Sequence, residues 1–155
     1  MNRIAFFKFL TFAMASLIMV GCATGPKPPQ MTITVDASLS INPDLNLRPS
    51  PVVLSVYYLK ASSIFSGARF VELYANKQDV LGTDLLGTEE LEVSPGESMS
   101  LAQRELPEET RVIGVVAAFR DIDNATWRGF IDIEPGEKFG LIIRIDDLNL
   151  TVDKQ

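Results

Sequence analysis

Few residues of this chain could do chemistry, and its single cysteine, Cys22, is the most informative of them. One cysteine can form neither an intramolecular disulfide nor a cysteine-cluster metal site. The chain has no histidine, which removes Ser-His-Asp and Cys-His catalysis, imidazole zinc sites and the usual general base near neutral pH. The chemistry left to Cys22 is that of a lone thiol, and its sequence context indicates which reaction it undergoes.

Cys22 follows a segment with the organisation of a secretory signal peptide. Residues 1–8 are short and basic, residues 9–20 (FLTFAMASLIMV) are uncharged, and Gly21 is a small residue before the cysteine. This apolar run is short for a membrane-spanning helix, which needs about 20 residues. The segment 19–22 (MVGC) is similar to the lipobox read by the lipoprotein signal peptidase, with methionine in place of the commoner leucine. We therefore predict a lipoprotein signal peptide over residues 1–21 and lipidation of Cys22, rather than an ordinary leader followed by a chance cysteine.

Lipidation of Cys22 would hold the chain on a membrane through acyl chains. One acyl chain binds only marginally and two anchor stably, so a triacylated cysteine is a permanent anchor. Ala23 follows Cys22, and the absence of an aspartate there favours the outer membrane over the inner membrane. Residues 22–30 contain three prolines and a glycine, which suit neither helix nor sheet. We expect a lipidated N-terminus and linker over 22–30 and a periplasmic domain over 31–155.

The charge of the mature chain excludes several partners. The whole chain has 14 basic and 20 acidic residues, and Arg3 and Lys8 lie in the leader, so its removal changes the net charge from −6 to −8. A domain this acidic has no basic surface for nucleic acid or for anionic lipid head groups.

The pattern after the linker predicts an all-β fold, a two-sheet β-sandwich of about eight strands. Short runs that alternate or are rich in β-branched residues, separated by turn signals, are typical of that architecture. The expected strands cover residues 32–35, 51–59, 91–93, 99–101, 111–119, 131–133, 139–145 and 148–152. Residues 61–86 carry apolar side chains at uneven three-to-five spacings, which predicts short helical insertions between strands 2 and 3. Pro-Gly pairs at 95–96 and 135–136 predict two hairpins of one build, and Gly114 predicts a bulge or a close contact.

The loop at residues 42–51 (NPDLNLRPSP) is the first candidate binding site. Leu45, Leu47 and Arg48 on a proline-stiffened loop suit protein recognition, because such a loop loses little ordering entropy on binding. The alternative is a plain strand connection whose leucines fold back under the sheet. The residues alone leave both interpretations open.

For three other groups of polar residues, a functional role can be considered but a structural role is favoured. Residues 119–128 (FRDIDNATWR) could form a polar site, but a strand connection with an Arg–Asp pair and a tryptophan covering the core edge is favoured. Four aspartates at 121, 123, 146 and 147 could bind calcium, but no twelve-residue calcium loop is present. The glutamate pairs 89–90 and 108–109 could act as acid and base, but adjacent exposed carboxylates are usually solvated.

The chain from about residue 33 to 147 resembles the TssJ (SciN-type) family, the outer-membrane lipoproteins of the bacterial type VI secretion system. One departure is Tyr58, where a polar residue such as glutamine is expected. The resemblance depends on the order and spacing of short segments behind the lipobox, namely 48–53 (RPSPVV), 56–60 (VYYLK), Phe65, Phe70, Leu73, 81–86 (LGTDLL), 95–97 (PGE), 115–123 (VVAAFRDID) and Trp127-Arg128.

The resemblance implies a transthyretin-like sandwich without catalytic activity or cofactor, apart from the covalent lipid on Cys22. It implies that the protein anchors the trans-envelope membrane complex to the outer membrane by binding the periplasmic C-terminal region of TssM, which works with TssL. The implied contact is the loop between the first two strands, here Asn42, Pro43, Asp44, Leu45, Asn46, Leu47, Arg48 and Pro49. The alternative is a periplasmic lipoprotein that binds a small ligand or glycan, which should show an apolar cavity or an aromatic platform.

Overall fold

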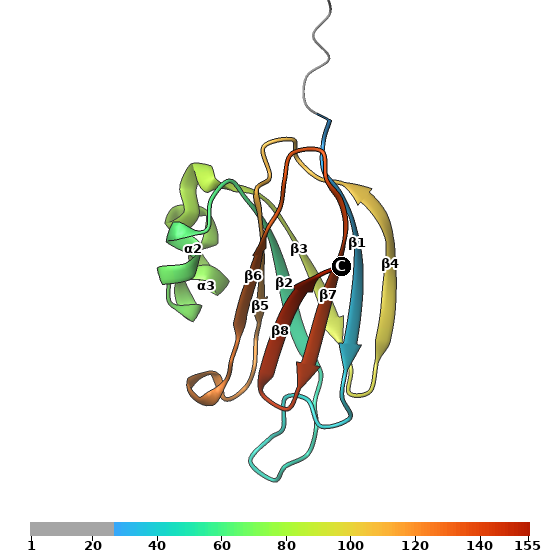
Figure 1. Cartoon of the computed structure of the whole chain (residues 1–155). Coiled ribbons are helices and arrows are strands. Elements are labelled where there is room, and N and C mark those ends of the chain that lie inside the picture. Colours follow the sequence, from blue (N-terminus) through green and yellow to red (C-terminus); the bar gives the residue numbers. More distant parts are fainter. Residues whose placement is uncertain (1–26) are drawn as a thin grey trace, which may run out of the picture.

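Two four-stranded sheets packed face to face form the body of the protein (Figure 1). The computed structural model describes residues 27–155, so the predicted signal peptide, Cys22 and most of the predicted linker lie outside the described residues. The strands are β1 (Gln30–Ala37), β2 (Val52–Leu59), β3 (Leu85–Val93), β4 (Ser98–Glu105), β5 (Val112–Ala117), β6 (Arg128–Asp132), β7 (Lys138–Asp146) and β8 (Asn149–Lys154). The prediction of an eight-strand, two-sheet sandwich is confirmed.

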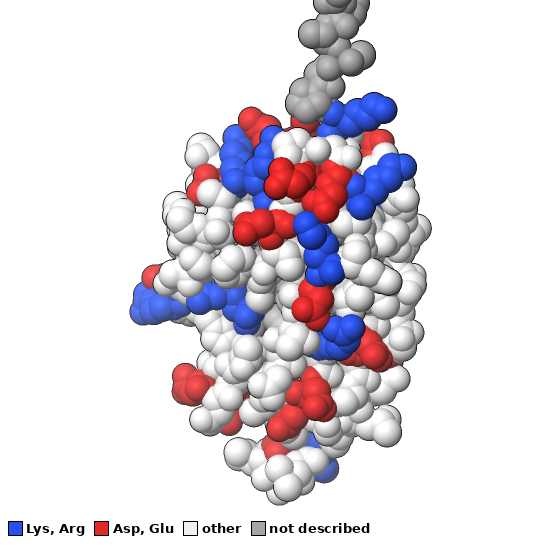
Figure 2. Space-filling model, in the orientation of Figure 1, with Lys and Arg blue, Asp and Glu red and all other residues white. Residues whose placement is uncertain are grey.

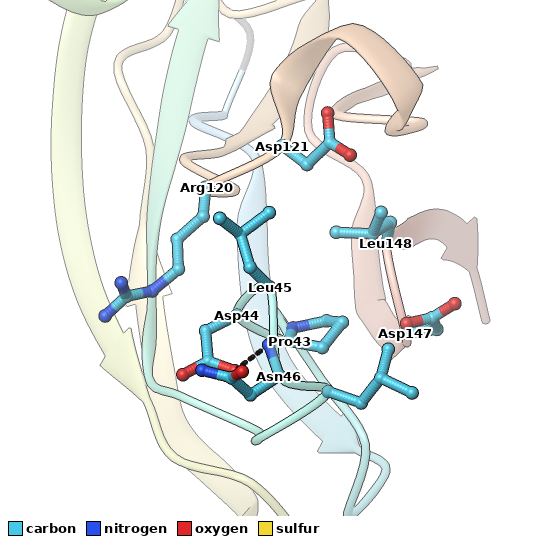
Figure 3. Close-up of a pocket in the computed structure, with 9 residues that line it drawn as sticks. Pro43, Asp44, Leu45, Asn46, Arg120, Asp121, Asp147 and Leu148 are labelled. Carbon is cyan, nitrogen blue, oxygen red and sulfur yellow. Dashed lines mark hydrogen bonds between the residues drawn. The ribbon is translucent and has the colours of Figure 1, made fainter.

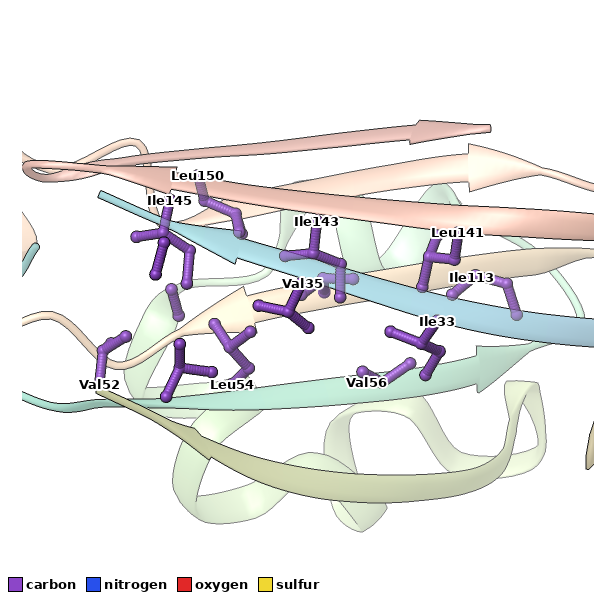
Figure 4. Close-up of a cluster of buried hydrophobic side chains, with 14 of the residues drawn as sticks. Ile33, Val35, Val52, Leu54, Val56, Ile113, Leu141, Ile143, Ile145 and Leu150 are labelled. Atoms are coloured by element: carbon purple, nitrogen blue, oxygen red, sulfur yellow. The ribbon is translucent and has the colours of Figure 1, made fainter. Parts of the chain in front are cut away.

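The sheet order explains which strands are buried most deeply. One sheet has the order β4-β1-β7-β8 and the other the order β3-β2-β5-β6. β1 and β7 pair in parallel, and the other neighbours pair antiparallel. In β1 and β7 the apolar residues alternate, as expected where only one face meets the core. Their inward side chains interdigitate with those of β2 and β5 (Figure 4), and this cluster includes Ile33, Val35, Leu54, Val56, Ile113, Leu141 and Ile143.

Two short helices cover the outer face of the second sheet. They are α2 (Ser63–Gly67) and α3 (Phe70–Leu81), followed by the 3₁₀ turn η1 (Gly82–Asp84), between β2 and β3 as the sequence predicts. A second apolar cluster fills the space between them and the sheet, with Tyr57, Leu59, Phe65, Leu73, Leu81, Val112 and Val116. β2 and β5 are thus buried on both faces, which explains their unbroken apolar sequences. Within residues 27–155, no helix has the length and apolar character needed to cross a membrane.

Gly114 is required by the packing of α2. A Cβ atom placed on Gly114 would lie 2.5 Å from Cζ of Phe65, whose ring sits directly over the glycine. The pairing of β5 with β2 and β6 continues through Gly114 without a register shift. Of the two alternatives for this glycine, the structure therefore shows the close contact and not the bulge.

The prediction of two hairpins at the Pro-Gly pairs is wrong. β3 and β6 belong to one sheet, whereas β4 and β7, which follow them, belong to the other. Each pair therefore forms an arch that carries the chain between sheets. The two arches share one build: Gly96 and Gly136 have φ of 75° and 71°, and Glu97 and Glu137 accept hydrogen bonds from the backbone N–H groups of residues 94 and 134. The local chemistry specifies a tight turn, but it does not specify which sheet receives the next strand.

Residues 27–30, at the end of the predicted linker, and the predicted binding loop lie at opposite ends of the sandwich (Figure 1). The chain enters β1 beside the β6–β7 arch, where the backbone N–H of Gln30 donates to the carbonyl of Glu137 and that of Leu106 donates to Pro29. β1 then crosses the sandwich over eight residues, or about 26 Å at the usual rise of a strand. The β1–β2 loop, the η2 turn (Ile122–Asn124) between β5 and β6, and the β7–β8 turn lie together at the far end.

Candidate functional site

The β1–β2 loop presents its leucines to solvent. Leu45 and Leu47 are 103% and 83% exposed, which makes them two of the most exposed large apolar side chains among the described residues. The alternative in which these leucines fold back under the sheet is therefore not what the structure shows. Two largely exposed leucines close together on one loop form an apolar surface of the kind that often marks an interaction site.

Asp44 and Arg48 hold the loop in a compact turn. The Asp44 carboxylate accepts hydrogen bonds from the backbone N–H groups of Asn46 and Arg48 at 2.8 and 3.0 Å, and from Nε of Arg48 at 2.8 Å. The Arg48 guanidinium also forms an ion pair with Asp44 at 2.7 Å. The hydrogen bond from Arg48 is the main reason that the pKa of Asp44 lies below its usual value. This turn sets the positions of the two leucines between its ends, so Asp44 and Arg48 shape the loop.

Asn42 ties the base of the loop to two other segments. Its side chain donates to the carbonyl of Pro51 at 2.7 Å and accepts from the backbone N–H of Arg120 at 2.8 Å. Its own backbone N–H donates to the carbonyl of Asp147 at 2.9 Å. Asn42 adopts a φ of 48°, a left-handed conformation that asparagine tolerates better than most residues. At 2% exposure its side chain is not available to a partner, so among the expected contact residues Asn42 has a positioning role.

A cleft of about 870 Å³ lies between the loop and its two neighbours at this end of the sandwich (Figure 3). The loop contributes one wall, with Pro43, Asp44, Leu45, Asn46 and Leu47. The other wall comes from the β5–β6 connection and the β7–β8 turn, with Arg120, Asp121, Asp147 and Leu148. The sequence drew attention to the loop, but it gave no sign that Leu148 would face it. Five of the eight expected contact residues therefore line one cleft, while Arg48 and Pro49 are exposed beside it.

The segment 119–128 divides between two places. Arg120 and Asp121 border the cleft, whereas Trp127 and Arg128 face the helices. Arg128 donates to the carbonyls of Phe65 and Ala68 at 2.8 and 2.7 Å, and its guanidinium carbon lies 4.7 Å from the centre of the Trp127 ring. This half of the segment therefore attaches α2 to the sheet. The favoured structural interpretation holds for Trp127, but no Arg–Asp ion pair of this segment occurs among the described residues.

The weaker candidates gain no support from the geometry. Across residues 27–155, no group of three or more acidic, cysteine or histidine side chains could hold a metal ion. Glu89 and Glu90 pair with Arg104 and Lys77, and Glu109 pairs with Lys60. No aromatic side chain lines the cleft, so it lacks the aromatic platform expected of a glycan-binding module. The candidate site is thus a protruding apolar loop beside a cleft.

Comparisons with known proteins show the family of the chain. A family model described as "Type VI secretion lipoprotein, VasD, EvfM, TssJ, VC_A0113" matches residues 29–149. The T6SS lipoprotein TssJ1 from Pseudomonas aeruginosa, a solved structure, is 33% identical and superposes with a TM-score of 0.78 over 83% of this chain and 97% of that one. A search of the curated proteins returns no match to the chain.

Two further solved structures share the fold at lower identity. Serratia marcescens Lip, a membrane bound component of the Type VI Secretion System, is 22% identical, with a TM-score of 0.70 over 83% of this chain and 98% of that one. A chain in a structure described as the T6SS protein TssM C-terminal domain from EAEC is 24% identical, with a TM-score of 0.66 over 79% of this chain and 99% of that one.

The fold is that of a small two-sheet β-sandwich with short helices on one face. The chain belongs to the type VI secretion lipoprotein family that includes TssJ. It is therefore a structural, non-enzymatic component of the type VI secretion membrane complex.

Proposed function

We propose that this lipoprotein anchors the type VI membrane complex to the outer membrane by binding the periplasmic C-terminal region of TssM with its β1–β2 loop. The observation that carries the proposal is the exposure of Leu45 and Leu47 at the end of the sandwich opposite residues 27–30, through which the chain would connect to a lipidated Cys22. A solved structure named for the TssM C-terminal domain contains a chain with this fold, which supports TssM as the partner.

The placement of the two ends suits a molecular tether. Acyl chains on Cys22 would hold the linker end against the inner leaflet of the outer membrane, and three acyl chains make that attachment effectively permanent. The β1–β2 loop would then point away from the lipid, into the periplasm. Such an orientation makes the loop accessible to a protein that reaches across the periplasm from the inner membrane, where TssM works together with TssL.

The rigidity of the loop supports a role in recognition. Asp44, Arg48 and Asn42 fix its backbone through hydrogen bonds within the described residues. Binding then requires little further ordering of the chain, so more of the contact free energy appears as affinity. Exposed leucines that desolvate on contact supply that energy at about 25 cal/mol per Å² of apolar surface.

Binding between residues 23–155 and the purified periplasmic C-terminal region of the cognate TssM tests the proposal. Both sheets and both apolar clusters lie within this fragment, so it carries a complete core. We expect micromolar or tighter binding, and at least a tenfold loss in the double variant Leu45→Ala/Leu47→Ala. Leu39→Ala is the matched control, because Leu39 is 77% exposed at the same end but does not line the cleft. No binding by the wild-type fragment would refute the proposed partner, and full binding by the double variant would move the interface elsewhere.

Cys22→Ser tests the lipid end of the tether separately. The described fold makes no use of this residue, so the variant should melt at the wild-type temperature and bind TssM normally, yet fail to fractionate with outer membranes. A variant that still fractionates with outer membranes would show that the attachment does not depend on Cys22.

A further inference from the structure

Four residues of the cleft come from outside the β1–β2 loop, and three of them, Asp121, Asp147 and Leu148, form the wall opposite Leu45. Asp121 follows β5, and Asp147 and Leu148 form the tight turn between β7 and β8. Figure 3 shows Leu148 directed toward Leu45, with the Asp121 and Asp147 carboxylates on the same side of the cleft as Leu148. The Asn42 side chain accepts a hydrogen bond from the β5–β6 connection and the Asn42 backbone N–H donates one to the β7–β8 turn, which fixes these residues relative to the loop.

The two carboxylates of this wall are not neutralised within the described domain. None of the ion pairs among residues 27–155 includes Asp121 or Asp147. Among residues 27–155, the side-chain hydrogen bonds of Asp121 come from Nδ2 of Asn124, at 3.0 and 2.9 Å. Arg120, the arginine that lines the cleft, donates from Nε to the hydroxyl of Ser50, and Figure 3 shows its side chain on the other side of Leu45.

The surface around the cleft adds further negative charge to that of the two aspartates. On the face that Figure 2 shows, lysine and arginine side chains gather toward the linker end, while the loop end presents mainly acidic and uncharged surface. Asp44 on the loop is already paired with Arg48, so the unpaired carboxylates of the cleft are those of Asp121 and Asp147. Arg120, which also forms no ion pair among residues 27–155, lies on the other side of Leu45 from them.

We propose that the partner segment docking in this cleft carries a basic side chain between apolar ones, with the cation bracketed by Asp121 and Asp147 and the apolar groups packed on Leu45, Leu47 and Leu148. This inference rests on the proposed function, because it describes the chemistry by which TssM would be recognised. The interface would then include the β1–β2 loop, the β5–β6 connection and the β7–β8 turn, and the partner segment would need a basic side chain flanked by apolar ones.

The physical reason is the cost of covering a carboxylate. Docking an apolar segment over the three leucines removes water from the cleft, and a carboxylate that loses water without gaining a partner destabilises the complex by several kcal/mol. A cation from the partner offsets this cost and speeds association through electrostatic steering. An acidic partner segment would instead be repelled by both aspartates. The cleft therefore selects for an apolar segment with positive charge.

The test uses residues 23–155 and the periplasmic C-terminal region of the cognate TssM, with association and dissociation rates measured at about 0.05 and 0.5 M NaCl, across which screening increases strongly. The double variant Asp121→Asn/Asp147→Asn removes both charges at constant shape, and asparagine also tolerates the φ of 53° at position 147. The matched control is Asp123→Asn, which removes a charge two residues from Asp121 but outside the cleft.

At low salt we expect the double variant to bind about tenfold more weakly, with most of the loss in the association rate and a shallower salt dependence, while the control changes less than about twofold. If the double variant binds as tightly as the wild type and with the same salt dependence, this inference is overturned and the proposed function stays intact. An equal loss in the control would also overturn it, because net charge alone would then be responsible. If the wild-type fragment does not bind at all, the proposed function fails and this inference fails with it.

Discussion

Asn42→Ala is the substitution that tests most sharply how the binding end is held together. The alanine removes two side-chain hydrogen bonds, to the carbonyl of Pro51 and from the N–H of Arg120. Each contributes about 1 kcal/mol net to stability. Alanine at a φ of 48° costs about 1 kcal/mol more, because it tolerates the left-handed region less well than asparagine. The expected loss in the free energy of unfolding is therefore about 3 kcal/mol.

Urea unfolding of residues 23–155 measures this loss. With an m-value of about 2 kcal/mol/M, the midpoint should fall by about 1.5 M at unchanged m. Asn42→Gly should lose less than Asn42→Ala, because glycine adopts the left-handed conformation without strain. The control Asn46→Ala, on the exposed tip of the loop, should change stability by less than about 0.5 kcal/mol. A cost below 1 kcal/mol for Asn42→Ala, or an equal cost for Asn46→Ala, would refute the role given to Asn42.

Three further predictions concern the core beside the helices. Gly114→Ala should lower the free energy of unfolding by about 1 to 3 kcal/mol, because the added Cβ would lie 2.5 Å from the ring of Phe65. A thermal melt measures this loss. Gly67→Ala is the control and should be nearly neutral, because its Cβ would meet nothing within 4 Å. Tyr57→Phe should cost about 1 to 2 kcal/mol in urea unfolding, because the buried hydroxyl donates to the carbonyl of Leu73 at 2.8 Å; an unchanged midpoint would contradict this. Burial raises the pKa of Tyr57 to about 12, above the usual value of about 10, so the neutral ring stabilises the fold below pH 10 and that contribution is lost as the pH rises to 12. Stability measured against pH should fall across this interval, and less steeply in Tyr57→Phe.

The central strands could be predicted from sequence because burial on both faces leaves a strong local signal. β2 and β5 are nearly continuous apolar runs, and both were expected close to their observed bounds. β3 was expected only over residues 91–93, although it begins at Leu85, because it is an edge strand with mostly half-buried side chains and no clear alternation. The helical stretch was consequently extended two residues too far, to residue 86.

The organisation of the site depends on contacts between distant residues, and local patterns do not report those. Composition and turn chemistry identified the β1–β2 loop, but the position of Asn42 depends on Arg120, 78 residues further along the chain. Leu148 faces the loop only because β7 ends beside the end of β1 and β8 begins beside the segment that leads into β6. The direction of the two Pro-Gly arches was missed for the same reason, since a tight turn has the same sequence signature within one sheet and between two.

Co-flotation with liposomes tests the central claim most directly, because it requires both ends of the tether in one molecule. Purified, lipidated protein is inserted into vesicles, the periplasmic C-terminal region of the cognate TssM is added, and the mixture is floated through a density gradient. The account predicts that the TssM fragment floats with the wild-type protein and remains at the bottom with Leu45→Ala/Leu47→Ala, although that variant itself floats. It also predicts that neither protein floats when Cys22→Ser replaces the lipidated chain. A TssM fragment that floats equally with the loop variant, or that stays behind when the wild-type lipoprotein floats, would contradict the account.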